Sequence, residues 1–187
     1  MPDENDIQRF LVDLSDFVRF KTGIRFDACL ERTTRLDITR DFEIGESKVL
    51  TIIKELCNID LPKYNRRPFN HTSVSFENKG KVKNKKYLIY SKYQECLDNN
   101  ASETEIELAK GILRLEIQHK DNRAVSNLAK SLKLPNHKAG RIITRETSEK
   151  VIGDAMRLLN LESLLNNQSE SKLETLASHF DSPICVG

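Results

Sequence analysis

The sequence predicts a mixed α+β fold in which an antiparallel sheet of about four or five strands packs on helices. Four segments alternate apolar and polar residues with the period of a half-buried strand. Segments with helical spacing precede, separate and follow them. The chain of 187 residues is 38% hydrophobic and 31% charged, which is typical of a globular chain with one well-developed core.

The first helix is predicted over residues 6–20, where apolar residues recur at i, i+3 and i+4, and Gly23 should end it. The alternating stretch 34–44 predicts a strand with one wet face. Ser47 should then cap a helix that runs to about Asn58. A proline-containing connector over 61–70 leads to the next strand.

Three more strands are predicted over 71–78, 85–93 and 112–120. A basic turn joins the first two as a β-hairpin, and an acidic helix over 103–110 precedes the last. Spacing beyond residue 120 is helical, so we expect an α+β domain over 1–120 and a helical region over 121–187. The stretch 151–165 has the apolar stripe of a core or interface helix, which leaves a homodimer open.

Several classes of protein are excluded by composition. No apolar run approaches the ~20 residues that cross a bilayer, and the N-terminus is acidic and polar, so we expect a cytoplasmic protein without membrane contact. The four cysteines lie far apart without a C-x-x-C pair, and the four histidines are equally scattered. Neither set predicts a disulfide framework or a zinc site.

Positive charge is concentrated in two blocks. Residues 63–93 carry nine Lys or Arg against one Asp or Glu, and residues 110–145 carry nine against two, although the whole chain has a net charge of only +2. Such runs are often solvated faces. Two of them, interleaved with tyrosines, favour contact with a polyanion, and DNA is the one we expect.

The polar side of the predicted sheet is where function is expected. Strand periodicity places Asp37 on it from 34–44 and Glu116 from 112–120, and we assign Tyr90 and Lys92 of 85–93 to the same side. Two carboxylates suit Mg²⁺ or Mn²⁺, and a tyrosine beside a cation can act as a nucleophile. The alternative is that the carboxylates only form surface ion pairs with neighbouring arginines, Arg35 and Arg114.

The order of these elements resembles rolling-circle replication initiators of plasmids and phages, in particular the filamentous-phage gene II/X type and related replication-initiation factors. The resemblance spans about residues 30–160. It rests on an R-x-D strand, a Y-x-K-x-x-E segment and an L-R-x-E strand in that order. These are Arg35 and Asp37; Tyr90, Lys92 and Glu95; and Leu113, Arg114 and Glu116.

The resemblance implies an HUH-like endonuclease fold in 1–120, without the opening strand usual in such proteins, acting in the cytoplasm of a bacterial host cell. It implies that Tyr90 attacks single-stranded or hairpin origin DNA, leaving a 5′-phosphotyrosyl bond and a free 3′-hydroxyl that primes replication. Lys92 would support the nucleophile, Asp37 and Glu116 would bind the metal, and Tyr93 is the second candidate nucleophile.

Two other functions remain open. A non-catalytic DNA-binding protein, either a regulator or an inactive relative of the initiators, would use residues 122–146, whose pattern resembles a helix-turn-helix with a second helix presenting His137, Lys138, Arg141 and Arg145. A protein-interaction module would use the basic loop on an acidic partner. The expected DNA contacts are Arg35, Arg66, Arg67, Lys81, Lys83, Lys85, Lys86, Arg114, Lys138 and Arg141.

Overall fold

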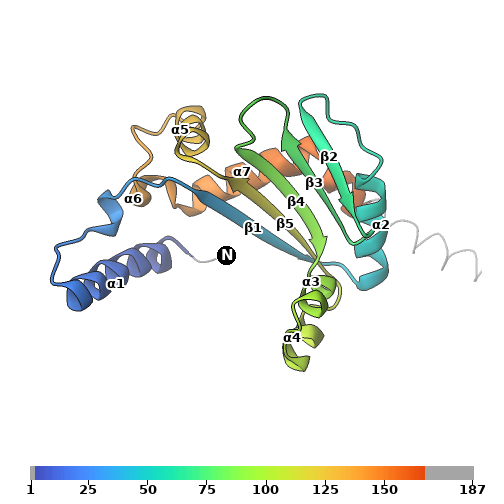
Figure 1. Cartoon of the computed structure of the whole chain (residues 1–187), viewed down its shortest axis with the longest axis horizontal. Coiled ribbons are helices and arrows are strands. Elements are labelled where there is room, and N and C mark those ends of the chain that lie inside the picture. Colours follow the sequence, from blue (N-terminus) through green and yellow to red (C-terminus); the bar gives the residue numbers. More distant parts are fainter. Residues whose placement is uncertain (1–2, 167–187) are drawn as a thin grey trace, which may run out of the picture.

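The computed structural model describes residues 3–166 and contains a five-stranded antiparallel sheet (Figure 1). The strands lie in the order β1–β5–β4–β3–β2, and every neighbouring pair is antiparallel. Their bounds are β1 (Leu36–Glu43), β2 (Tyr64–Phe69), β3 (Ser73–Asn78), β4 (Lys85–Ser91) and β5 (Ile112–His119). The predicted fold class is therefore confirmed.

One face of the sheet is apolar and carries the main core. Strand β5 alternates strictly, so Leu113, Leu115 and Ile117 are fully buried while the residues between them remain partly exposed. Helices α2 (Glu46–Leu56) and α7 (Arg145–Leu158) cover this face (Figure 1). Burying each such leucine or isoleucine contributes about 1.5–3 kcal/mol, so this layer holds the sheet and the helices together.

The helices beyond residue 121 belong to the same core. Helix α5 (Asn122–Ser131), the short α6 (Ala139–Ile142) and α7 all contribute buried residues to the cluster that contains the sheet. The predicted stripe of 151–165 faces this core through Val151, Ile152, Ala155, Leu159 and Leu161. Of the two alternatives for that stripe, the structure shows the core helix.

Strand β2 was not predicted, because its sequence lacks alternation and contains Pro68. Proline cannot donate to a ladder and is tolerated at a sheet edge, which is where β2 lies. A tight turn joins β2 to β3: Asn70 and His71 both have positive φ, and the Thr72 amide donates to the Phe69 carbonyl at 3.1 Å. This geometry is that of a type I′ turn, which matches the twist of paired strands.

The connection from β4 to β5 is helical. Ser91 ends β4 and caps α3 (Lys92–Asp98), since its hydroxyl accepts from the Gln94 amide at 3.2 Å. Helix α4 (Glu103–Leu108) follows as predicted, with a capping box between Ser102 and Glu105. The predicted strand 85–93 is thus two residues too long. Lys92 and Tyr93 are helical.

Helix α1 (Glu4–Thr22) is attached separately from the main core (Figure 1). Leu11 packs with Ala28 of the 3₁₀ turn Ala28–Leu30 and with Ala139 of α6 in a second small cluster. Gly23 ends the helix at φ 70°, as predicted. The predicted cap of α2 was wrong: Gly45 occupies that position, and no side chain caps the helix. None of the described helices is long and apolar enough to span a bilayer.

Candidate active site

The polar face of the sheet presents three cross-strand rows of side chains. Antiparallel register places residues in direct opposition, so one row runs Asp41, Arg114, Tyr90, Ser73 and Phe69 across all five strands. The next row contains Thr39, Glu116, Leu88, Ser75 and Arg67, and the third contains Asp37, Gln118, Lys86, Glu77 and Asn65. The assignment of Tyr90 to the polar face with Glu116 and Asp37 therefore agrees with the register.

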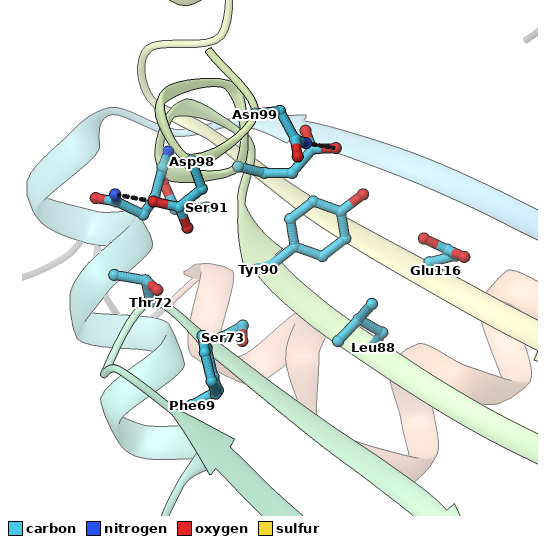
Figure 2. A pocket seen from close by; sticks show the side chains of 11 residues that line it. Phe69, Thr72, Ser73, Leu88, Tyr90, Ser91, Asp98, Asn99 and Glu116 are labelled. Carbon is cyan, nitrogen blue, oxygen red and sulfur yellow. Dashed lines mark hydrogen bonds between the residues drawn. The ribbon is translucent and has the colours of Figure 1, made fainter. Parts of the chain in front are cut away.

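Tyr90 lies on the middle strand of the sheet, next to the end of β4, in a pocket of about 400 Å³ (Figure 2). The pocket lies where β4 gives way to α3, so the strand supplies its floor and the helix supplies one wall. Figure 2 shows the phenol ring between the side chains of α3 and Glu116. The lining residues are Phe69, Thr72, Ser73, Leu88, Tyr90, Ser91, Gln94, Glu95, Asp98, Asn99 and Glu116.

The tyrosine hydroxyl experiences opposing influences. Burial raises the pKa of Tyr90 above its ordinary value of 10, Arg114 lowers it, and the carboxylates of Glu116 and Glu95 raise it further. In the free protein the phenol is therefore neutral at physiological pH. To act as a nucleophile, this phenol would have to lose its proton during the attack.

Arg114 is held beside Tyr90 by Asp41. The guanidinium donates two hydrogen bonds to the carboxylate, Nε to Oδ1 at 2.6 Å and Nη2 to Oδ2 at 2.7 Å. This fork geometry fixes the plane of the arginine. The hydrogen bond from Arg114 lowers the pKa of Asp41 and raises that of Arg114 further above its ordinary range. Both groups are therefore charged at neutral pH.

Lys92 and Glu95 form an ion pair on the first turn of α3. The hydrogen bond to Glu95 raises the pKa of Lys92, so the lysine is a stable cation. Because β4 ends at Ser91, Lys92 reaches this position from the helix and not as the strand neighbour of Tyr90. Glu95 lines the pocket, whereas Lys92 does not.

The two expected metal ligands differ in their surroundings. Asp37 and Glu116 are diagonal neighbours, since Thr39 is the residue opposite Glu116. Arg35 engages Asp37 through Nη2 at 2.7 Å, and Glu116 accepts from Gln118 Nε2 at 2.6 Å. Glu116 lines the pocket of Tyr90, but Asp37 does not. Over residues 3–166 no group of three or more His, Cys, Asp or Glu is arranged to hold a metal ion.

Tyr93, the second candidate nucleophile, lies in α3 and is not among the residues that line the pocket. Its hydroxyl is near enough to Lys110 to influence that amine, on the side of α4. The helical turn after Ser91 therefore separates the two tyrosines. Tyr90 alone of this pair lies against Glu95 and Glu116.

The expected DNA-contacting cations fall into four groups. Arg35, Arg67, Lys86 and Arg114 occupy the polar face or its β1 side, and Lys81 and Lys83 lie on the β3–β4 turn. Arg66 and Lys85 have the opposite strand phase: Arg66 donates to the Ile59 carbonyl at 2.8 Å, and Lys85 lies 5.0 Å from the centre of the Tyr87 ring. Lys138 and Arg141 are exposed far along the chain, at α6.

The helix-turn-helix expected over 122–146 is not formed. Helix α5 buries Val125, Leu128 and Ala129 as predicted, but the second helix has only the four residues of α6. The segment before it is pinned by the chain near residue 32, since the Thr33 amide donates to the His137 carbonyl at 3.0 Å. A single turn held against the chain in this way cannot enter a DNA groove as a recognition helix.

The sequence did not identify Asp41, Phe69, Asp98 or Asn99 as parts of this site. Asp41 belongs to the alternating polar phase of β1, but only the strand register reveals that it meets Arg114. Ser91 and Gln94, three residues apart, have the S-x-x-Q spacing of a helix start, and this signal could have located the end of β4. No protein-family model, curated protein or solved structure matches the chain.

Proposed function

We propose that this protein nicks single-stranded DNA through Tyr90, as a rolling-circle replication initiator does. The observation that carries the proposal is the Tyr90 hydroxyl in a pocket on the uncovered polar face, in the same cross-strand row as the Asp41–Arg114 pair. A nucleophile and a fixed cation side by side suit an attack on a phosphodiester, in which negative charge develops on the phosphate oxygens.

In this reaction the Tyr90 oxygen forms a bond to phosphorus while the bond from phosphorus to the 3′ oxygen breaks. The 5′ phosphate becomes esterified to the tyrosine. Glu116 accepts the phenol proton, and water supplies the proton that the released 3′-hydroxyl requires. Arg114 faces the phosphate and stabilises its charge, while Asp41 keeps the guanidinium in place. Arg67 and Lys86, in neighbouring rows, contact the DNA backbone on either side.

A divalent ion, Mg²⁺ or Mn²⁺, fits this site only in part. Glu116 and Glu95 both line the pocket, but Glu95 is paired with Lys92 and Asp37 is paired with Arg35. Two carboxylates leave most of an oxygen coordination sphere to be filled by the phosphate and water. When bound there, the ion would supply further positive charge at the phosphate.

The test is covalent capture. Wild-type protein incubated with end-labelled single-stranded DNA of mixed sequence and Mn²⁺ should give an adduct that survives denaturation. Tyr90→Phe should give none, and Tyr93→Phe, a matched tyrosine on the same connection, should give the wild-type amount. An adduct of wild-type intensity in Tyr90→Phe would refute the proposal.

A second candidate is a protein that binds DNA on this face without cutting it. The specific observation in its favour is that burial raises the pKa of Tyr90 while the described residues offer no three-ligand metal group. This candidate predicts binding that weakens steeply with salt, because phosphate contacts release counterions, and no adduct under any metal condition.

A further inference from the structure

Phe69 is a large apolar side chain exposed on an otherwise polar surface. It is 63% exposed at the end of β2, and it shares its cross-strand row with Ser73 and Tyr90. The type I′ turn that follows it is closed by the hydrogen bond from the Thr72 amide to the Phe69 carbonyl. The ring therefore extends from a backbone fixed by strand pairing and by this turn.

The pocket of Tyr90 offers Phe69 a complementary set of neighbours. Leu88 supplies a second apolar surface on its floor, and the opposite wall is formed by the side chains of α3. Gln94 and Asp98 are joined by a hydrogen bond of 2.8 Å, and Asn99 donates to Glu95 at 3.4 Å. Figure 2 shows Phe69 and Glu116 on opposite sides of Tyr90, so Phe69 lies on the side of the tyrosine away from that carboxylate.

An exposed apolar ring facing a row of amide and carboxylate groups matches the chemistry of a nucleobase. A base has an apolar face that stacks on aromatic side chains and a polar edge that exchanges hydrogen bonds with Asn, Gln and Asp. The volume of about 400 Å³ lies within the range of small-molecule sites. Arg67, in the row next to Phe69, lies where the phosphate of the same nucleotide would be neutralised.

We propose that Phe69 stacks one unpaired nucleobase beside the phosphate attacked by Tyr90, with the α3 side chains Gln94, Asp98 and Asn99 contacting the edge of that base. This inference rests on the proposed function, because it takes single-stranded DNA as the substrate. It deepens that function by assigning a base subsite. It also predicts weaker binding of duplex DNA, because a paired base is stacked on both faces and cannot lie on the ring.

The experiment measures binding of a single-stranded oligonucleotide that carries 2-aminopurine at successive positions, without metal so that no cleavage occurs. Stacking on Phe69 should quench or shift the fluorescence at one position. Phe69→Ala should weaken binding about tenfold and abolish that change, since base–aromatic stacking is worth about 1–3 kcal/mol per base. Phe69→Trp, which preserves a stacking ring, should bind as wild type does.

The matched control is Phe17→Ala, because Phe17 is 58% exposed but lies on α1. Equal affinity of Phe69→Ala and wild type, or an equal loss in Phe17→Ala, would overturn the base subsite.

The covalent adduct is measured in parallel with Tyr90→Phe. Loss of the adduct in Tyr90→Phe with unchanged binding in Phe69→Ala would leave the proposed function standing without the subsite. Position-specific stacking without any adduct would retain the subsite and refute nicking. A wild-type protein that does not bind the oligonucleotide would refute both.

Discussion

His119 makes the stability of this protein sensitive to mild acid. The imidazole ends β5 and is 1% exposed, and neither ring nitrogen makes a well-formed hydrogen bond in the described part of the chain. Burial lowers the pKa of His119 from 6.5 to about 4, and the nearby Lys85 lowers it too, while the Leu36 backbone and then the Asp37 carboxylate act in the other direction. The native state therefore keeps this histidine neutral well below the pH at which an unfolded chain would protonate it.

The sign and size of the effect follow from proton linkage. Between pH 6.5 and about 4 the unfolded chain binds a proton that the native chain excludes, so the free energy of unfolding falls as pH falls through this window. The stability that comes from keeping His119 neutral is fully present above pH 6.5 and is lost as the pH falls toward 4. At about 1.4 kcal/mol per pKa unit, lowering the pH from 7 to 5 should remove about 2 kcal/mol, and the full loss near pH 4 should be about 3 kcal/mol.

Urea denaturation at pH 7 and pH 5 measures this difference directly. The comparison is with His119→Leu, which cannot titrate and keeps a residue of similar volume in the core. Both proteins share every other titrating group, so the wild type should lose about 2 kcal/mol more than the variant over this interval. Equal losses in the two proteins would show that the buried imidazole does not resist protonation, and the reasoning would be wrong.

Three further predictions test the site and the fold. Asp41→Asn should slow adduct formation at least tenfold, because it frees Arg114, and adduct kinetics measure this effect. The same change should lower the free energy of unfolding by at most about 1 kcal/mol in a urea titration, because the ion pair is partly exposed. Gly111→Ala should destabilise by about 1–3 kcal/mol, because Gly111 has φ +71° and a Cβ there would lie 2.9 Å from the Cα of Gly45. Gly153→Ala in α7 should stabilise by about 0.5–1 kcal/mol, because a Cβ there would meet only the Arg157 guanidinium, at an ordinary contact distance of 3.9 Å. Lys138→Glu should leave the affinity for single-stranded DNA unchanged in a fluorescence titration; a loss as large as that of Arg67→Glu would place DNA at α6 instead of the sheet.

Periodicity predicted most of the sheet because the core depends on it. Strands β1 and β5 bury residues of one phase only, and that regularity is visible in the sequence, whereas β3 also buries Ser75 of the polar phase. Strand β2 escaped prediction because it lies at the edge, where exposure removes alternation. The end of β4 was misplaced because Lys92 and Tyr93 continue the apparent alternation while Ser91 already caps a helix.

The sequence predicted which side chains share the polar face, but it did not predict which of them form ion pairs across strands. Strand phase was enough to place Tyr90 and Glu116 on one face. The partner of Arg114 was not readable, because Asp41 lies 73 residues away and meets it only when β1 and β5 adopt one particular register. Arg35 is only two residues from Asp37, so the sequence did suggest that ion pair, and the structure confirms it. Asp37 does not line the pocket of Tyr90.

Because α1 is attached separately, it should open locally at a lower free energy than the main core does. Only Leu11 of this helix is buried, against a small cluster, whereas β5 lies in the centre of the main core. Lifting α1 off exposes little apolar surface and breaks no strand pairing, so its amides should exchange with deuterium through local opening, long before those of β5. A protease acting near Gly23 would then release the helix and leave the five-stranded sheet intact.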